Sequence, residues 1–248
     1  MTGKDILLFD LDGTLTDPAV GITRSVQHAL RAFGIQVDNP TELYGFIGPP
    51  LTESFIRFFE FTREQAVRAV EVYREYFADT GIYENAIYPG IPSLLADLRQ
   101  EGKQLILATS KPTVFARRIL EYFQLTPYIT YISGSFLDGR RTDKAEVIHH
   151  GLEQAGAGDL SRAVMVGDRE YDVYGAKQAG IPCIGVSYGY GSRRELEDAG
   201  AQLVVDTVEE PVSYTHLAFP FQLTQSVYQT GRLNSGSHIV HPQDMGTA

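Results

Sequence analysis

Two acidic residues stand close together near the start of the chain. Asp10 and Asp12 follow the apolar run Ile6–Phe9 and precede Gly13. On extended backbone, side chains two residues apart project to the same side. Two carboxylates at 4 Å repel each other by roughly 4 kcal/mol at an effective dielectric constant of about 20, so the pair requires a cation or a proton. The preceding strand and the turn that Gly13 permits favour a chemical site over an acidic helix cap.

Hydroxyl and amine side chains follow two further segments. Thr109 and Ser110 come directly after Leu105–Ala108, and a hydroxyl between a strand and a helix can hold a phosphoryl oxygen together with the helix N-terminus. Taken alone, such a residue more often caps the helix. Lys144 opens a predicted helix, where its charge opposes the helix dipole. Lys144 therefore either pairs with an acidic group in a site or, if it is read in isolation, is an ordinary solvated surface lysine.

A second acidic pair ends another apolar run. Asp168 follows Val166 and Gly167, and Asp172 lies four residues on, about one helical turn, so their carboxylates can converge. In parallel α/β sheets, ligands bind beyond the carboxyl ends of the strands. The acids, the hydroxyls and the lysine stand at such ends and together predict one site.

Short apolar runs that lack alternation predict the buried strands that position these residues. The predicted strands are Ile6–Phe9, Gln104–Ala108, Tyr128–Ile132, Ala163–Val166, Cys183–Val186 and Gln202–Val205. The predicted helices between them are Ile91–Glu101, Val114–Phe123, Lys144–Ala155, Tyr171–Ala179 and Arg193–Ala199. Strands that alternate with helices predict the α/β class, with a Rossmann-like parallel sheet covered on both faces.

One long segment interrupts this alternation. Residues 17–87 read as helices only, with apolar residues at helical spacing. The segment predicts an inserted α-helical cap, attached through hinges near residues 16–19 and 86–90. Its predicted helices are Val20–Phe33, Leu51–Phe59 and Arg63–Phe77.

The insertion divides the rest of the chain. Residues 1–16 and 88–210 form the predicted catalytic core. Residues 211–248 contain only Arg232 and Asp244 as charged side chains and show no sustained periodicity. We therefore predict that this tail lies outside the core.

The composition excludes several classes of partner. The net charge of −10 disfavours a nucleic acid polymer or an acidic membrane surface, which the long-range field would repel. A small phosphorylated metabolite is compatible with it. The single cysteine, Cys183, lies in an apolar run and is predicted to be a buried thiol, which leaves no disulfide framework or cysteine-based zinc site. We see no signal peptide and no membrane-spanning stretch, and we expect a cytoplasmic monomer or homodimer.

With these motifs identified, the chain resembles the haloacid dehalogenase (HAD) superfamily over residues 5 to about 210. Asp10-Leu-Asp-Gly-Thr-Leu-Thr-Asp17, Thr109, Lys144 and Gly167-Asp168…Asp172 match its motifs I to IV in order. The insertion is similar to the small helical cap of the phosphoglycolate phosphatase-like branch. Phe46-Ile-Gly-Pro-Pro-Leu51 and Tyr188-Gly-Tyr-Gly191 resemble segments of bacterial members described as 5′-nucleotidase-like or phosphoglycolate phosphatase-like.

The resemblance implies a Mg²⁺-dependent phosphatase. Asp10 would be the nucleophile that forms an aspartyl phosphate, and Asp12 would protonate the leaving group and then activate water. Mg²⁺ would be held by Asp10, by Asp168, by the backbone carbonyl of Asp12, and by Asp172 as a ligand or an outer partner. The phosphoryl oxygens would be bound by Thr109, Ser110, Lys144 and the backbone N–H groups that follow Asp10, those of Leu11 and Asp12.

Three positions separate this chain from other branches that the family contains. Asp12 distinguishes phosphatases from dehalogenases, which lack it. Ile22 stands where the sugar-phosphate mutase branch carries a histidine, and Leu11 stands where P-type ATPases carry a lysine. The resemblance therefore implies water as the final acceptor.

The substrate stays open between a nucleoside monophosphate, which we favour slightly, phosphoglycolate and a sugar phosphate. A phospho-accepting signalling domain is a remote alternative, because it places its acceptor on the third strand and has no cap. Candidate substrate-reading residues of the cap are Phe46, Ile47, Gly48 and Arg24. Tyr188 and Tyr190 either border the pocket or, as we expect, simply pack.

Overall fold

The computed structural model describes residues 4–208 and 210, which belong to one compact unit of the chain. The predicted tail, residues 211–248, lies outside the described residues. Six parallel strands form the main sheet, in the order β5-β4-β1-β6-β7-β8. They are β1 (Ile6–Phe9), β4 (Gln104–Pro112), β5 (Tyr131–Ser135), β6 (Ala163–Gly167), β7 (Cys183–Val186) and β8 (Leu203–Val205).

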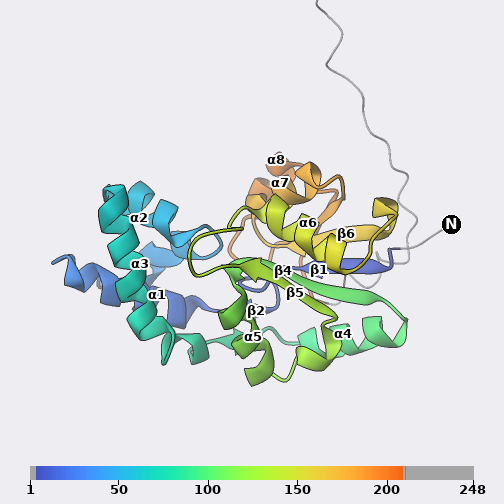
Figure 1. Ribbon diagram of the computed structural model, residues 1–248, viewed down its shortest axis with the longest axis horizontal. Helices are drawn as coiled ribbons and strands as arrows, with labels where there is room; N and C mark the ends of the chain where they lie inside the picture. The colour runs from blue at the N-terminus through green and yellow to red at the C-terminus, as the bar shows by residue number, and fades with distance from the viewer. Residues whose placement is uncertain (1–3, 209, 211–248) are drawn as a thin grey trace, which may run out of the picture. The chain divides into compact units, whose positions relative to one another are not determined.

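Helices cover both faces of this sheet (Figure 1). One face carries α4 (Ile91–Gln100) and α5 (Thr113–Tyr122), and the other carries α6 (Lys144–Gln154), α7 (Glu170–Gln178) and α8 (Arg193–Ala199). Because side chains alternate along a strand, Leu7 and Phe9 of β1 pack with α4 and α5, whereas Leu8 packs with α6 and α7. The predicted α/β class with a parallel, Rossmann-like sheet is confirmed.

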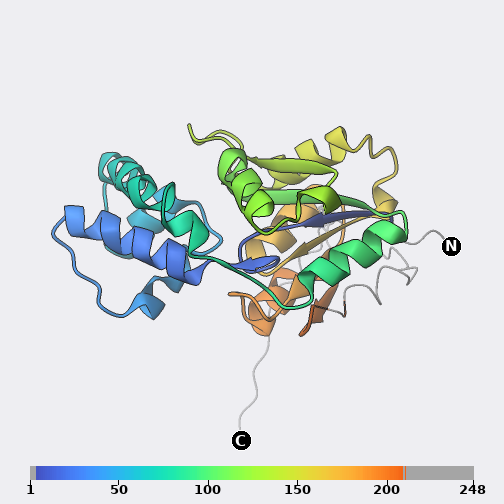
Figure 2. The ribbon, with the colours of Figure 1, turned by 90° about the horizontal axis from the view of Figure 1, so that it is seen from below.

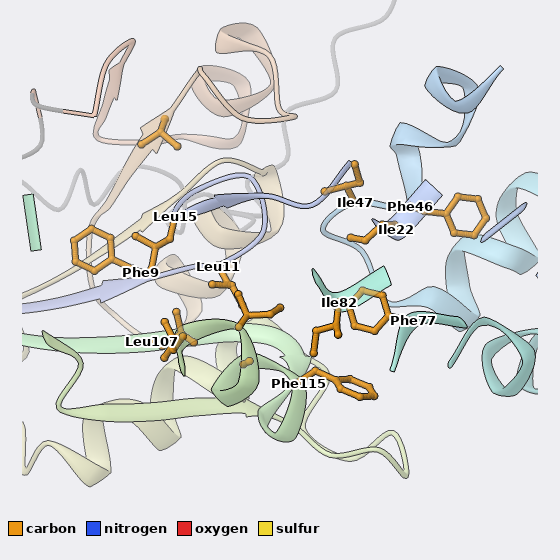
Figure 3. Packing of buried hydrophobic residues seen from close by; sticks show 14 of the residues in the cluster. Phe9, Leu11, Leu15, Ile22, Phe46, Ile47, Phe77, Ile82, Leu107 and Phe115 are labelled. Atoms are coloured by element: carbon orange, nitrogen blue, oxygen red, sulfur yellow. The ribbon is translucent and has the colours of Figure 1, made fainter. Parts of the chain in front are cut away.

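The segment between β1 and α4 holds α1 (Ala19–Ala32), α2 (Leu51–Phe59) and α3 (Arg63–Phe77), which gather as one group, blue to teal in Figure 2. The 3-10 helices η1 (Pro40–Phe46) and η2 (Gly81–Tyr83) complete it. A capping box between Thr62 and Gln65 begins α3. Phe77 at the end of α3 meets Phe115 of α5 edge to face, with ring centroids 5.3 Å apart (Figure 3), so the apolar core runs without a break from the insertion into the sheet layer.

The expectation that residues 17–87 are helical throughout is wrong at both ends of the segment. Thr16–Asp17 (β2) and Ala86–Ile87 (β3) form a two-stranded antiparallel ribbon, with Thr16 opposite Ile87. Each piece is two residues long, and its pairing depends on a partner some 70 residues away, which no local pattern signals. The ribbon occupies the two connections that the sequence predicts as hinges.

Two strand boundaries also differ from the prediction. Strand β5 begins at Tyr131, because Thr126–Tyr128 form a 3-10 turn (η3) that contains Pro127. Strand β4 continues past Ala108 to Pro112 through a register shift. A further 3-10 turn, η4 (Leu160–Arg162), precedes β6. Cys183 is buried, as predicted, and no helix in the described residues is long and apolar enough to cross a membrane.

Candidate active site

The site lies where the central strands of the sheet end. Phe9, the last residue of β1, is in register with Leu107 of β4 on one side and Val166 of β6 on the other. The Asp10 N–H donates to the Val166 carbonyl at 3.0 Å and so continues this pairing. The residues that follow each strand therefore converge at one edge, as predicted for parallel strands.

Three of the predicted acids form a compact cluster. Asp10, Asp168 and Asp172 each offer a carboxylate oxygen, and these oxygens lie within 4.8 Å of one another. Their exposures of 4%, 0% and 1% remove them from bulk water. Glycines make room for them: a Cβ at Gly13, where φ is +82°, would stand 2.1 Å from Asp168 Oδ2, and a Cβ at Gly167 would stand 2.2 Å from Asp172 Cγ.

Lys144 lies between two of these acids. Its Nζ is 3.0 Å from Asp10 Oδ1 and 2.7 Å from Asp172 Oδ1, and it donates to the Ala108 carbonyl at 3.3 Å. Burial alone would lower the pKa of Lys144, but the charges of Asp10 and Asp172 hold it above its ordinary value. Asp143 caps the helix that Lys144 opens. The two ion pairs explain a cation at a helix start, so the surface reading of Lys144 is wrong.

The cluster carries more negative charge than Lys144 neutralises. Burial, followed by the charges of Asp172 and Asp10, raises the pKa of Asp168 well above its ordinary value. Burial also raises the pKa of Asp172 to about 6, although Lys144 opposes the shift. Buried carboxylates that resist ionisation in this way fit a cation, and an all-oxygen donor set suits Mg²⁺.

Asp12 lies apart from this cluster and faces a different cation. The Lys111 Nζ is 2.7 Å from Asp12 Oδ2, and the side chains are 7% and 11% exposed. Asp12 Oδ1 is buried and accepts no hydrogen bond within residues 4–208 and 210. Burial raises the pKa of Asp12, although Lys111 opposes the shift. Asp12 adds no carboxylate oxygen to the acid cluster. By the resemblance, it would contact the metal only through its backbone carbonyl.

Lys111 is a site residue that our sequence analysis did not select. Its ammonium also lies 4.6 Å from the centre of the Phe77 ring of α3, so it joins Asp12 to the inserted helices. Its position directly after Thr109 and Ser110 is the signal that would have found it.

The other predicted phosphate-binding residues lie at the same edge. Thr109 is buried near the end of β4, and its hydroxyl accepts a hydrogen bond from the Lys111 N–H at 3.3 Å. Ser110 lines the pocket described below. Leu11 is buried, and its carbonyl accepts the N–H groups of Leu15 and Thr16 at 2.9 and 3.0 Å, which closes the turn that carries the two aspartates.

A pocket opens beside Asp12, between this edge and the inserted helices. Phe46 and Gly48, two of the candidate substrate-reading residues, line it. Ile47 is buried, and its carbonyl accepts a hydrogen bond from Arg169 at 2.6 Å. Arg24 lies elsewhere, half-exposed in an ion pair with Glu84. Aromatic and aliphatic groups supply most of the pocket wall, and its charged residues are Asp12, Arg74 and Lys111.

The two tyrosines of the Tyr188–Gly191 segment support the acidic turn. Tyr188 packs on Tyr88, with ring centroids 5.0 Å apart, and its hydroxyl donates to the Thr14 carbonyl at 3.0 Å. The Tyr190 hydroxyl bonds to the Asp17 carboxylate, and the Tyr190 N–H donates to Asp168 Oδ2 at 2.8 Å. They pack, as expected, and also form hydrogen bonds that the sequence did not reveal.

This fold and acidic edge define a family. A model of haloacid dehalogenase-like hydrolases matches residues 7–186, well over half of the chain. The chain belongs to this family, and the predicted class, a HAD-type phosphatase, is confirmed.

Named proteins are similar to most of this chain. A 5′-nucleotidase of Pseudomonas aeruginosa is 50% identical over 77% of this chain and 86% of its own. A tyrosine-protein kinase, PtkA, of Mycobacterium tuberculosis is 40% identical over 81% of this chain and 67% of its own. The crystal structure of a predicted phosphatase from Clostridium acetobutylicum superposes with a TM-score of 0.83 at 47% identity, covering 86% of this chain and 98% of that one.

Proposed function

We propose that this protein is a Mg²⁺-dependent phosphatase that hydrolyses small phosphate monoesters through a phosphorylated Asp10. The observation that carries the proposal is the buried cluster of Asp10, Asp168 and Asp172, whose oxygens lie within 4.8 Å of one another. These three residues would hold the metal, which when bound neutralises charge on the phosphoryl oxygens. Asp12 would contribute its backbone carbonyl.

Asp10 and Asp12 divide the chemistry. The Asp10 carboxylate attacks phosphorus, the bond to the leaving oxygen breaks, and Asp12 gives that oxygen a proton. Asp12 then takes a proton from water, which attacks phosphorus and releases inorganic phosphate from Asp10. Asp12 lines the pocket, and its Oδ1 accepts no hydrogen bond among the described residues, which supports this double role because that oxygen is free to carry a proton.

The phosphoryl oxygens are bound by groups at the strand ends. Lys144, already 3.0 Å from Asp10, places a positive charge beside the transferring group. We assign to Thr109 and Ser110 hydroxyl contacts, and to Leu11 and Asp12 backbone N–H contacts. In the same proposal, residues 1–16 and 88–210 act as the catalytic core and residues 17–87 as a cap that covers the leaving group.

We place the substrate among nucleoside 5′-monophosphates, because the P. aeruginosa relative at 50% identity is named a 5′-nucleotidase. Phosphoglycolate and sugar phosphates are the alternatives. The predicted cytoplasmic location and the monomeric or homodimeric state stay predictions.

Turnover of p-nitrophenyl phosphate tests the proposal. We expect turnover with Mg²⁺ and none with EDTA. Asp10→Asn should abolish it, whereas the control Asp198→Asn, an exposed acid paired with Arg194, should leave it unchanged. Acid quenching of the wild type followed by peptide mass analysis should find one phosphoryl group on the peptide that contains Asp10.

Three outcomes contradict the proposal. They are full activity in EDTA, full activity of Asp10→Asn, and transfer of the phosphoryl group to a tyrosine peptide in preference to water. The third outcome matters because the M. tuberculosis relative is named a kinase.

A further inference from the structure

The pocket beside Asp12 has a wall made by α3. Tyr73 and Arg74 of that helix line the pocket together with Asp12 and Lys111. If Asp12 protonates the leaving oxygen, as the proposed function requires, the leaving group occupies this pocket. Tyr73 and Arg74 then face the part of the substrate that distinguishes one phosphate monoester from another.

The Tyr73 side chain is a hydrogen-bond donor in this wall of the pocket. The residue is 4% exposed, and its ring is held in place by stacking on Phe77, with ring centroids 5.3 Å apart. Its hydroxyl forms no hydrogen bond with another described residue and is not one of the fully enclosed unpaired polar atoms, so it is open to the pocket. Burial, followed by the negative charge of Asp12, raises the pKa of Tyr73 well above its ordinary value, so the phenol keeps its proton. A phenol hydroxyl that is open to a pocket and has no protein partner is available to donate to a group bound there.

The Arg74 guanidinium is a second donor with spare capacity. It donates to the Leu137 carbonyl at 2.9 Å, which uses one of its five N–H groups. No carboxylate among the described residues lies within ion-pair distance of it. Glu71, one helical turn before it, is paired with Arg68 at 2.7 Å, and the neighbouring Glu75 lies 3.7 Å from His28 Nε2. Arg74 therefore brings an unpaired positive charge into the pocket.

Both polar side chains that α3 contributes to the pocket can donate hydrogen bonds. Lys111 is also a donor, and the pocket's one carboxylate, Asp12, is paired with it. We infer that Tyr73 and Arg74 are specificity-determining residues that bind oxygen acceptors on the leaving group. The inference rests on the proposed function and deepens it: the preferred substrates are phosphate monoesters whose leaving alcohol carries a carboxylate, carbonyl or second phosphoryl group.

The test compares substrates that do and do not carry such acceptors. Phenyl phosphate has none on its leaving group, whereas 2-phosphoglycolate carries a carboxylate and uridine 5′-monophosphate carries carbonyl oxygens. Tyr73→Phe removes only the hydroxyl and keeps the ring on Phe77. It should lower kcat/KM about 10-fold for the better acceptor-bearing substrate, and Arg74→Met about 10- to 100-fold, with less than about twofold change for phenyl phosphate.

Matched variants of residues outside the pocket serve as controls. Tyr122→Phe removes an exposed hydroxyl, and Arg68→Met removes a cation from the same helix as Arg74. Both should leave all three substrates unchanged. Equal losses on all three substrates in Tyr73→Phe and Arg74→Met, or no loss on any, would overturn the inference. Mg²⁺-dependent turnover of phenyl phosphate by the wild type tests the proposed function separately. If the wild type does not hydrolyse phenyl phosphate, the proposed phosphatase function is contradicted, whatever the variants show.

Discussion

Asp10 and Asp12 are two residues apart in the chain, yet they lie in two different halves of the site. Asp10 shares its half with Asp168, Asp172 and Lys144, which all come from the ends of sheet strands or the helices after them. Asp12 faces Lys111, whose ammonium lies over Phe77 of the inserted helices. Asp10 thus shares one lysine with other acids, whereas Asp12 faces a lysine of its own beside a pocket.

The difference shows that separate parts of the fold position the two aspartates. The acid cluster is formed by residues that follow parallel strands and by the first turn of α7. The surroundings of Asp12 depend on contacts with α3. Changes on the Asp10 side should therefore act on metal binding, and changes on the Asp12 side should act on the leaving group.

Removal of single acids gives the largest expected effects. Asp168→Asn should lower kcat by about 10⁴-fold or more and weaken Mg²⁺ binding, since it removes a carboxylate that the cluster needs. Asp12→Asn should lower kcat by about 10²- to 10⁴-fold, because a general acid and base is lost, with Mg²⁺ affinity retained. Calorimetric Mg²⁺ titration alongside steady-state kinetics measures both. Equal loss of Mg²⁺ affinity in the two variants would remove the distinction between the halves.

The two lysines should differ in how Mg²⁺ compensates for their loss. Each side chain is 7% exposed, so replacing either by Met leaves buried carboxylates unpaired and should cost about 3 kcal/mol of unfolding free energy in EDTA. Mg²⁺ should restore much of the loss in Lys144→Met, because a cation enters the same cluster. It should restore little in Lys111→Met. Urea denaturation with and without Mg²⁺ measures these changes in unfolding free energy. An equal gain from Mg²⁺ in both variants would contradict a metal site beside Lys144.

The acid cluster should also make stability depend on pH when metal is absent. Asp172 has a folded pKa of about 6 against an ordinary 3.8, so the folded state binds more protons than the unfolded state between these values. Stability from this group is present at low pH and is lost as pH rises through about 6, an effect of about 2 to 3 kcal/mol. Mg²⁺ should oppose this loss by favouring the ionised form. The Tm gain from Mg²⁺ should thus be larger at about pH 7.5 than at about pH 5, and Asp172→Asn should shrink that difference. A Tm gain independent of pH would exclude this linkage.

Arg24→Ala should have the smallest effect. Arg24 is half-exposed and paired with Glu84 outside the pocket wall, so kcat/KM should change by less than about twofold for any substrate. The same assay on Arg74→Met provides the contrast. A selective loss for one substrate in Arg24→Ala would restore it as a substrate-reading residue.

The sheet and the acidic edge could be predicted from the sequence because both depend on local patterns. Apolar runs locate parallel strands. Asp10 and Asp168 follow two such strands and Thr109 lies in the last part of a third, so the parallel arrangement brings them to one edge. Lys144 could be placed for the same reason, since it begins the helix after β5.

What could not be predicted are pairs between segments that no periodicity connects. The ion pair of Lys111 with Asp12 and the Tyr188 hydroxyl bond to Thr14 depend on where loops fold back. The β2–β3 ribbon is too short to show a strand pattern, and Pro127 shifts the start of β5. Arg24 and Phe46 looked alike as candidate cap residues, and only packing separates the one that lines the pocket from the one that does not.

The small ribbon of β2 and β3 has a consequence for how such enzymes diversify. Thr16 pairs with Ile87 and Asp17 with Ala86, so the inserted segment leaves the sheet and returns to it at one place. Its length is therefore uncoupled from the register of the six strands. A segment of another size or shape could begin and end on the same four residues. It would replace the recognition surface as a cassette, and the strand ends that hold the nucleophile would not move.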